Sequence, residues 1–132
     1  MSQAQDRPLL LLVEDHADTR QMYAEFLGSS FDVLEAGDGR QALEVLRRHI
    51  PAVVITDFSL PGIDGFELTR QIRGNASTRD VPVICLSGYS GNRYEEQARK
   101  VGCDRVLEKP CLPDALAAAA REMAAHGRPT QP

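Results

Sequence analysis

The sequence has no apolar run long enough for a membrane span and no cluster of basic residues. A transmembrane helix needs roughly 20 consecutive apolar residues, and the apolar runs in these 132 residues are much shorter. The net charge is −4, and no segment is rich in lysine and arginine. Binding to a polyanion therefore has no electrostatic support. We expect neither nucleic acid nor a membrane among the partners.

Cysteine is scarce, and the first residues do not have the pattern expected of a signal peptide. The three cysteines, Cys85, Cys103 and Cys111, are an odd number, and their spacing matches no zinc-binding signature. We interpret them as small apolar residues in a reducing compartment, with a redox role as the alternative. The amino-terminal sequence MSQAQDRP is polar and lacks the apolar core of a signal peptide. These features predict a cytoplasmic protein.

Length and composition indicate one globular domain. A chain of 132 residues, of which 42% are apolar and 26% are charged, can bury a sizeable core. We expect residues 1–7 to be a flexible lead-in and residues 8–127 to form the domain. Residues 128–132 are expected to be a tail or the stub of a linker.

Apolar runs alternate with helical patterns along the chain. The runs predict strands at residues 9–13, 31–36, 52–56, 81–86 and 105–107. Each strand precedes a segment with apolar residues at helical spacing, so the pattern predicts five strands and five helices. Such alternation is typical of an α/β fold, a doubly wound parallel sheet with helices on both faces.

Start and stop signals refine the helices. The first helix is expected to begin at an Asp18 N-cap, and Pro51 is expected to close the second. Asp64 and Pro113 mark the starts of the third and fifth helices. In the first helix, Met22, Tyr23, Phe26 and Leu27 are expected on one face. The second helix is expected to carry Ala42, Leu43, Leu46 and Ile50 at helical spacing.

Four of the predicted strands are followed by side chains that can bind or react. They are the pair Glu14 and Asp15, then Asp57, Ser87 and Lys109. Because parallel strands point the same way, these groups should meet at the carboxyl edge of the sheet, where α/β folds bind ligands. Each group alone has a simpler interpretation, as a solvated strand end, a turn acid, a turn serine or a surface lysine. Their combination in this order favours a common site.

Three carboxylates at one edge repel each other unless positive charge lies among them. Mg²⁺ suits such a site because it binds one or two carboxylates together with water and substrate oxygens. With Lys109 as a second positive charge, a phosphoryl group is the ligand that fits best. The predicted chemistry is transfer of this group to Asp57, with the Ser87 hydroxyl donating to one of its oxygens.

These residues make the sequence resemble the receiver domain of two-component response regulators, the CheY-like family. The resemblance covers about Pro8 to Gly127 and implies a flavodoxin-like sheet with strand order 2-1-3-4-5. It rests on Glu14-Asp15, on the segment with Asp57, Leu60-Pro61-Gly62 and Asp64-Gly65, on Ser87-Gly88 and on Lys109-Pro110.

The resemblance implies a metal site and a phosphoryl acceptor. Asp15 would bind Mg²⁺ directly and Glu14 through water, and the backbone carbonyl of Ser59 would be a further ligand. Asp57 would be both a metal ligand and the acceptor. The donor in this family is a phosphohistidine on a sensor histidine kinase or a phosphotransfer protein. The activity expected of the domain itself is self-phosphorylation and autodephosphorylation, not metabolic catalysis.

The resemblance also implies a conformational switch. Lys109 would contact the phosphoryl group, and the Lys109–Pro110 bond would be cis. Ser87 would move toward the new group and change the face formed by the fourth helix, fifth strand and fifth helix, which binds a downstream protein. Val106 stands where the family often has an aromatic ring, so the resemblance does not extend to coupling through such a ring. A monomer or a weak homodimer is expected.

Three alternatives stay open at this point. A degenerate receiver would bind partners without being phosphorylated, and only Val106 favours it. A haloacid-dehalogenase-like phosphatase would carry a second aspartate where Ser59 stands. A flavodoxin-like cofactor binder would need a phosphate-binding loop after the first strand, where Glu14 and Asp15 would repel phosphate.

Overall fold

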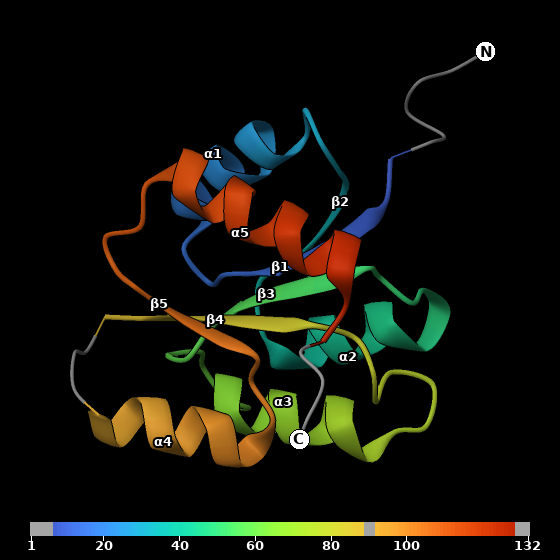
Figure 1. The fold of residues 1–132 in the computed structure, drawn as a ribbon, viewed down its shortest axis with the longest axis vertical. Coiled ribbons are helices and arrows are strands. Elements are labelled where there is room, and N and C mark those ends of the chain that lie inside the picture. The colour runs from blue at the N-terminus through green and yellow to red at the C-terminus, as the bar shows by residue number, and fades with distance from the viewer. Residues whose placement is uncertain (1–6, 89–91, 129–132) are drawn as a thin grey trace.

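Five parallel strands form one sheet in the computed structural model, and helices cover both of its faces (Figure 1). The structure describes residues 7–88 and 92–128. The strand order is β2-β1-β3-β4-β5, which confirms the predicted order and fold class. In chain order the elements are β1 (Leu9–Val13), α1 (Ala17–Leu27), β2 (Asp32–Ala36), α2 (Gly39–Arg48), β3 (Val53–Asp57), α3 (Gly65–Gly74), β4 (Val83–Ser87), α4 (Asn92–Val101), β5 (Arg105–Glu108) and α5 (Pro113–His126).

The apolar runs become the inner strands of the sheet. Every residue of β3 and β4 is buried, and a strand buried on both faces needs helices on both sides. Helices α1 and α5 pack on one face, and α2, α3 and α4 pack on the other. The parallel register places Val13 beside Thr56, and Asp57 beside Leu86. The last residues of neighbouring strands therefore lie at one edge.

Helix α1 differs from its prediction at its start and on its apolar face. It begins one residue before Asp18, which therefore lies in the first turn and does not cap the helix. Of the four apolar residues expected on one face, Tyr23 and Leu27 are buried, whereas Met22 and Phe26 are 44% and 45% exposed. The part of α1 that packs against the rest of the protein is thus narrower than the apolar face of the helix.

The other helix ends follow the predicted signals in α3 and α5 but not in α2. The Asp64 carboxylate accepts a hydrogen bond from the Glu67 backbone N–H at 2.9 Å, and this caps α3. Helix α5 begins at Pro113, as predicted. Helix α2 ends at Arg48, so the prediction that it includes Ile50 and is closed by Pro51 is wrong, and Ile50 is 57% exposed.

The predicted terminal segments lie largely outside the described residues. Residues 1–6 and 129–132 are not described. Arg7, which directly follows residues 1–6, donates to the Gly28 carbonyl at 2.9 Å. Arg128, which directly precedes residues 129–132, donates to the Asp104 carboxylate at 2.8 Å. The domain boundaries remain predictions.

The cysteines are only partly as predicted. Cys85 in β4 and Cys103 after α4 are buried in the apolar cluster beneath α3 and α4, as expected of small apolar residues. Their sulfur atoms are joined as a disulfide, which the sequence did not predict. Cys111 is a free thiol and is half-buried.

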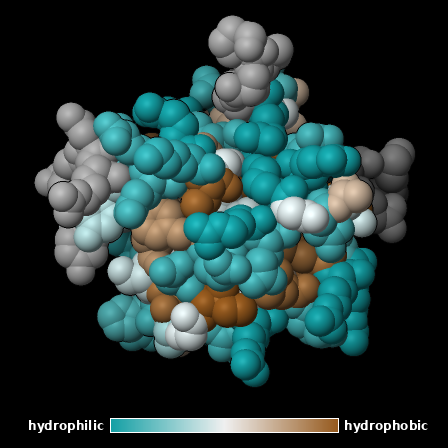
Figure 2. Space-filling view, turned by 90° about the horizontal axis from the view of Figure 1, so that it is seen from below, coloured by the Kyte–Doolittle hydropathy of each residue, from teal (hydrophilic) through white to brown (hydrophobic). Residues whose placement is uncertain are grey.

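The side of α3 and α4 is mainly polar. Figure 2 shows this face, on which hydrophilic side chains cover most of the surface and apolar patches appear between them. A groove of about 450 Å³ lies between the two helices, with Phe66 and Val101 in its lining. Among the helices of the described residues, none combines the length and the apolar character that a bilayer span requires.

Candidate functional site

Three carboxylates meet at the carboxyl edge of the sheet, as the strand order predicted. Glu14 and Asp15 follow β1, and Asp57 ends the neighbouring strand β3. One oxygen of each side chain lies within 4.8 Å of one from each of the others. Glu14 and Asp57 are buried and Asp15 is exposed, so the cluster opens to solvent on one side. An open acidic cluster of this size can hold a hard cation and leave positions for water or substrate.

Glu14 is fixed by bonds from several elements. Its backbone N–H donates to the Ala36 carbonyl at 3.0 Å, which extends the pairing of β1 with β2. Its carboxylate accepts from the His16 backbone N–H at 3.0 Å. Its carbonyl accepts from the Arg20 guanidinium at 2.8 Å, and Arg20 also pairs with Glu35 at 3.2 Å. Sequence reasoning missed Arg20, since an arginine on a helix surface gives no signal of such a contact.

Asp57 is held between a cation and a backbone donor. One carboxylate oxygen accepts from the Ser59 backbone N–H at 3.1 Å. The other pairs with the Lys109 ammonium group. The Asp57 side chain is 6% exposed, so its charge is largely removed from water. Burying a carboxylate is costly unless its oxygens are paired and hydrogen-bonded, and Lys109 and the Ser59 N–H provide these partners.

Lys109 connects the two buried carboxylates. Its ammonium nitrogen lies 3.3 Å from a Glu14 oxygen as well as contacting Asp57. Burial acts to lower the pKa of Lys109, but the hydrogen bond and charge of Asp57, together with Glu14, outweigh it, and the pKa is raised. The ammonium form is therefore the one present at neutral pH. The Lys109–Pro110 bond is cis, as the resemblance implied.

Ser87 lies on the next strand at the same edge. It ends β4 and is 1% exposed. Its neighbour Leu86 is paired with Asp57, so Ser87 extends one residue beyond Asp57. Its carbonyl accepts from the Lys109 backbone N–H at 2.7 Å, which ties the end of β4 to the segment after β5. Val106 lies beside Cys85 in the β4–β5 pair and packs on the apolar cluster beneath α4.

Gly65, the first residue of α3, is packed tightly against the end of β3. The Gly65 N–H donates to the Phe58 carbonyl at 3.0 Å. A Cβ at position 65 would lie 2.5 Å from the Asp57 carbonyl oxygen and 2.8 Å from the Phe58 Cα. Backbone atoms cannot give way as a flexible side chain can. A glycine at this position therefore lets α3 approach the strand that carries Asp57.

Replacing Gly65 with alanine is expected to lower the free energy of unfolding by about 1–3 kcal/mol, as overpacking usually does. Urea titration would measure this. Gly74→Ala is the matched control, because its added Cβ meets no described atom within 4 Å. Alanine there is expected to stabilise by about 0.4–1 kcal/mol. Equal stabilities for the two variants would contradict the tight contact at Gly65.

Comparisons with known proteins agree with this architecture. The family model described as the response regulator receiver domain matches residues 10–121. Response regulator Rre1 of Synechocystis is 37% identical over 120 residues, which are 88% of this chain and 51% of that protein. The chain therefore spans about half the length of this relative.

Solved structures that resemble this chain are also response regulators or receiver domains. CheY4, a chemotaxis response regulator of Vibrio cholerae, aligns with a TM-score of 0.83 and 26% identity over 88% of this chain and 98% of that one. The receiver domain of sensor histidine kinase PA1611 from Pseudomonas aeruginosa aligns with a TM-score of 0.80 and 29% identity, over 90% of this chain and 98% of that one. That structure has a magnesium ion coordinated in its active-site cleft. The matches and the acidic edge of the sheet together show that this chain belongs to the response regulator receiver domains, the signalling modules of two-component systems.

Proposed function

We propose that Asp57 accepts a phosphoryl group from a histidine kinase or phosphotransfer protein, with Mg²⁺ bound at the acidic cluster. The observation that carries the proposal is the position of the Asp57 carboxylate. It lies at the end of β3, paired with Lys109 and close to two further carboxylates. Lys109 and the Ser59 N–H hold this carboxylate in place, so the acceptor is positioned for a donor that approaches from the open side at Asp15.

The donor set fits Mg²⁺. Its oxygens are carboxylates, which hard cations prefer, and the exposed Asp15 leaves one side for water and a phosphoryl oxygen. Asp15, Glu14 and Asp57 would hold the ion, with the Ser59 backbone carbonyl as a further ligand. When bound, the metal would neutralise charge on the oxygens of the transferring group.

The remaining chemistry belongs to the side chains. A carboxylate oxygen of Asp57 forms a bond to phosphorus as the phosphorus–nitrogen bond of the donor breaks, and the released imidazole takes up a proton. Lys109, protonated and already beside Asp57, contacts the incoming phosphoryl group. Autodephosphorylation is attack of water on the acyl phosphate, which returns the free carboxylate and inorganic phosphate.

The face proposed to bind a downstream protein is formed by α4, β5 and α5. The Ser87 hydroxyl donates to the new group, and movement at the end of β4 changes the α4-β5-α5 face and its affinity for a downstream protein. The bond from the Lys109 N–H to the Ser87 carbonyl supports this route, because it joins β4 directly to the segment after β5. A cytoplasmic location and a monomer or weak homodimer remain predictions.

The test is incubation of the purified protein with acetyl phosphate and Mg²⁺, followed by intact-protein mass spectrometry. One base-labile, acid-stable phosphoryl group is expected. EDTA should abolish its incorporation, and excess Mg²⁺ should restore it, because the acidic cluster then regains its counter-ion. If no phosphoryl group is incorporated and calorimetry detects no Mg²⁺ binding, the proposal fails. The phosphorylation-independent binding module would then be the better description.

A further inference from the structure

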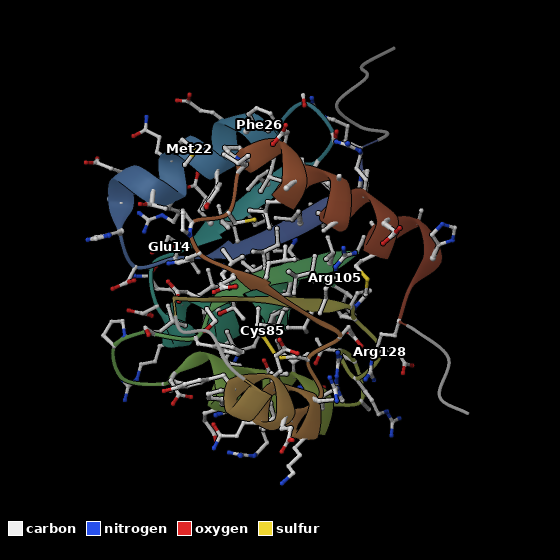
Figure 3. The ribbon with its side chains drawn as sticks, turned by 60° about the vertical axis from the view of Figure 1, so that its left-hand side comes forward. Glu14, Met22, Phe26, Cys85, Arg105 and Arg128 are labelled. Atoms are coloured by element: carbon white, nitrogen blue, oxygen red, sulfur yellow. A yellow bond between two sulfur atoms is a disulfide. The ribbon has the colours of Figure 1, made fainter. Side chains whose placement is uncertain are left out.

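A disulfide lies beneath α4, outside the acidic site. It joins Cys85, two residues before the end of β4, to Cys103, two residues after the end of α4. Figure 3 shows the bond between the central sheet and α4. The cysteines are 18 residues apart, and the loop they close contains all of α4. The bond therefore ties the segment after α4 to the strand that carries Ser87.

The surroundings suit the reduced form as well as the oxidised form. The Thr69 hydroxyl oxygen lies 3.6 Å from the Cys103 sulfur and 4.0 Å from the Cys85 sulfur. That hydroxyl donates its own hydrogen to the Gly65 carbonyl at 2.8 Å, so its lone pairs remain able to accept from S–H groups. Opening the bond leaves two thiols with a polar neighbour in an otherwise apolar cluster. Neither state forces an unsatisfied donor into the core.

Of the two cysteines, Cys103 lies nearer to solvent. Cys85 is 0% exposed, whereas Cys103 is 8% exposed. A hollow of about 110 Å³ opens at Cys103, between α4 and β5, and is lined by Glu95, Arg99, Cys103, Asp104, Arg105 and Val106. A space of this size admits the thiol-bearing end of a small molecule and excludes a folded protein.

We propose that Cys85 and Cys103 form a reversible redox site at which low-molecular-weight thiols and their disulfides exchange with Cys103 through this hollow. In oxidation, the Cys103 thiolate attacks a small disulfide and releases one small thiolate. The Cys85 thiolate then attacks the Cys103 sulfur and releases the second. The two protons lost by the cysteines pass to the released thiolates, so one small disulfide becomes two small thiols.

The oxidation state controls how firmly α4 is held. With the bond closed, the segment directly after α4 is covalently tied to β4, which limits how far α4 can move from the sheet. With the bond open, packing and hydrogen bonds alone hold that segment to β4. Reduction is therefore expected to lower the melting temperature by on the order of 10 °C, as for loss of a disulfide that closes a short loop. It should also speed amide hydrogen exchange in α4 more than in α1, which lies on the opposite face of the sheet.

The test uses the full chain carrying Cys111→Ser, which removes the free thiol. The protein is equilibrated in glutathione buffers of graded redox ratio, quenched with acid, alkylated and weighed. The expected result is a single two-electron transition between a form with no alkylated cysteine and a form with two. A bond that opens only on unfolding, or thiols that stay reduced in excess oxidised glutathione, would overturn the proposal.

Two further variants test the route of exchange. With Cys85→Ala added, Cys103 has no partner and should accumulate a mixed disulfide with glutathione in the native state. With Cys103→Ala added instead, the buried Cys85 should remain unmodified until the protein is unfolded. Equal modification of the two variants would overturn the assignment of Cys103 as the entry point. The redox titration of the Cys111→Ser protein tests the redox couple even if one of these two further variants fails to fold.

Discussion

Asp57→Asn is expected to abolish phosphoryl incorporation from acetyl phosphate in the presence of Mg²⁺. An amide lacks the anionic oxygen that attacks phosphorus, and it removes one charge from the cluster that would hold the metal. The Lys109 ammonium would also face a neutral group in place of its closest carboxylate partner. Asparagine has nearly the same size as aspartate, so the fold should persist. Intact-protein mass would show no added phosphoryl group, and circular dichroism would show a folded protein.

Two controls separate the acceptor from its surroundings. Asp15→Asn keeps Asp57 but removes the exposed member of the cluster, so incorporation should become slow and recover in part at high Mg²⁺. Asp18→Asn changes an exposed carboxylate in the first turn of α1 and should leave incorporation unchanged. A phosphoryl group that still appears on the Asp57→Asn protein, at whatever residue, would show that Asp57 is not the acceptor.

The grouping of the site residues could be predicted from the sequence because each lies at the carboxyl end of a parallel strand. Glu14, Asp57, Ser87 and Lys109 each end a strand or directly follow one. In a parallel sheet, such positions share an edge whatever the loops between them do. The polar groups therefore needed no further information to be brought together. The strand pattern predicted which residues lie close together, and the family resemblance then suggested what each of them does.

Helix α1 shows where periodicity stops being informative. Met22, Tyr23, Phe26 and Leu27 form one apolar stripe, yet only Tyr23 and Leu27 are buried. Helical spacing gives the width of a stripe but not the line along which the helix touches the sheet. That line depends on contacts with other segments, such as the hydrogen bond from the Tyr23 hydroxyl to the Cys111 carbonyl at 2.8 Å.

The contacts made by Cys103 and Asp104, which lie between α4 and β5, gave no signal in the sequence. The Cys85–Cys103 disulfide and the ion pairs of Asp104 join residues that lie far apart in the chain and fall in no shared pattern. Asp104 in particular resembles any polar residue in a turn before a strand. Its importance follows only from the structure, which places two arginines against it.

Asp104→Ala is expected to lower the free energy of unfolding by about 3–5 kcal/mol, a larger loss than that expected for Gly65→Ala. The Asp104 side chain is 3% exposed and pairs with Arg73 and Arg128, each at 2.8 Å. It also accepts from the Val83 backbone N–H at 2.8 Å. Burial acts to lower the pKa of Arg73, and the charge of Asp104 opposes that effect. Alanine would leave the Arg73 guanidinium with backbone carbonyl acceptors but without its carboxylate counter-charge, and it would leave the Val83 N–H without its acceptor.

The matched control is the exposed ion pair between Arg105 and Glu122, which has the same 2.8 Å separation but side chains that are 42% and 63% exposed. Water and salt screen such a pair, so Glu122→Gln should cost less than about 1 kcal/mol. Both variants would be unfolded in urea in one thiol-free buffer, so that the disulfide state is the same. If Asp104→Ala costs no more than Glu122→Gln, Arg73 must reach solvent once its partner is gone. The network would then be a surface feature, and burial would not be the reason that three segments of the chain meet at Asp104.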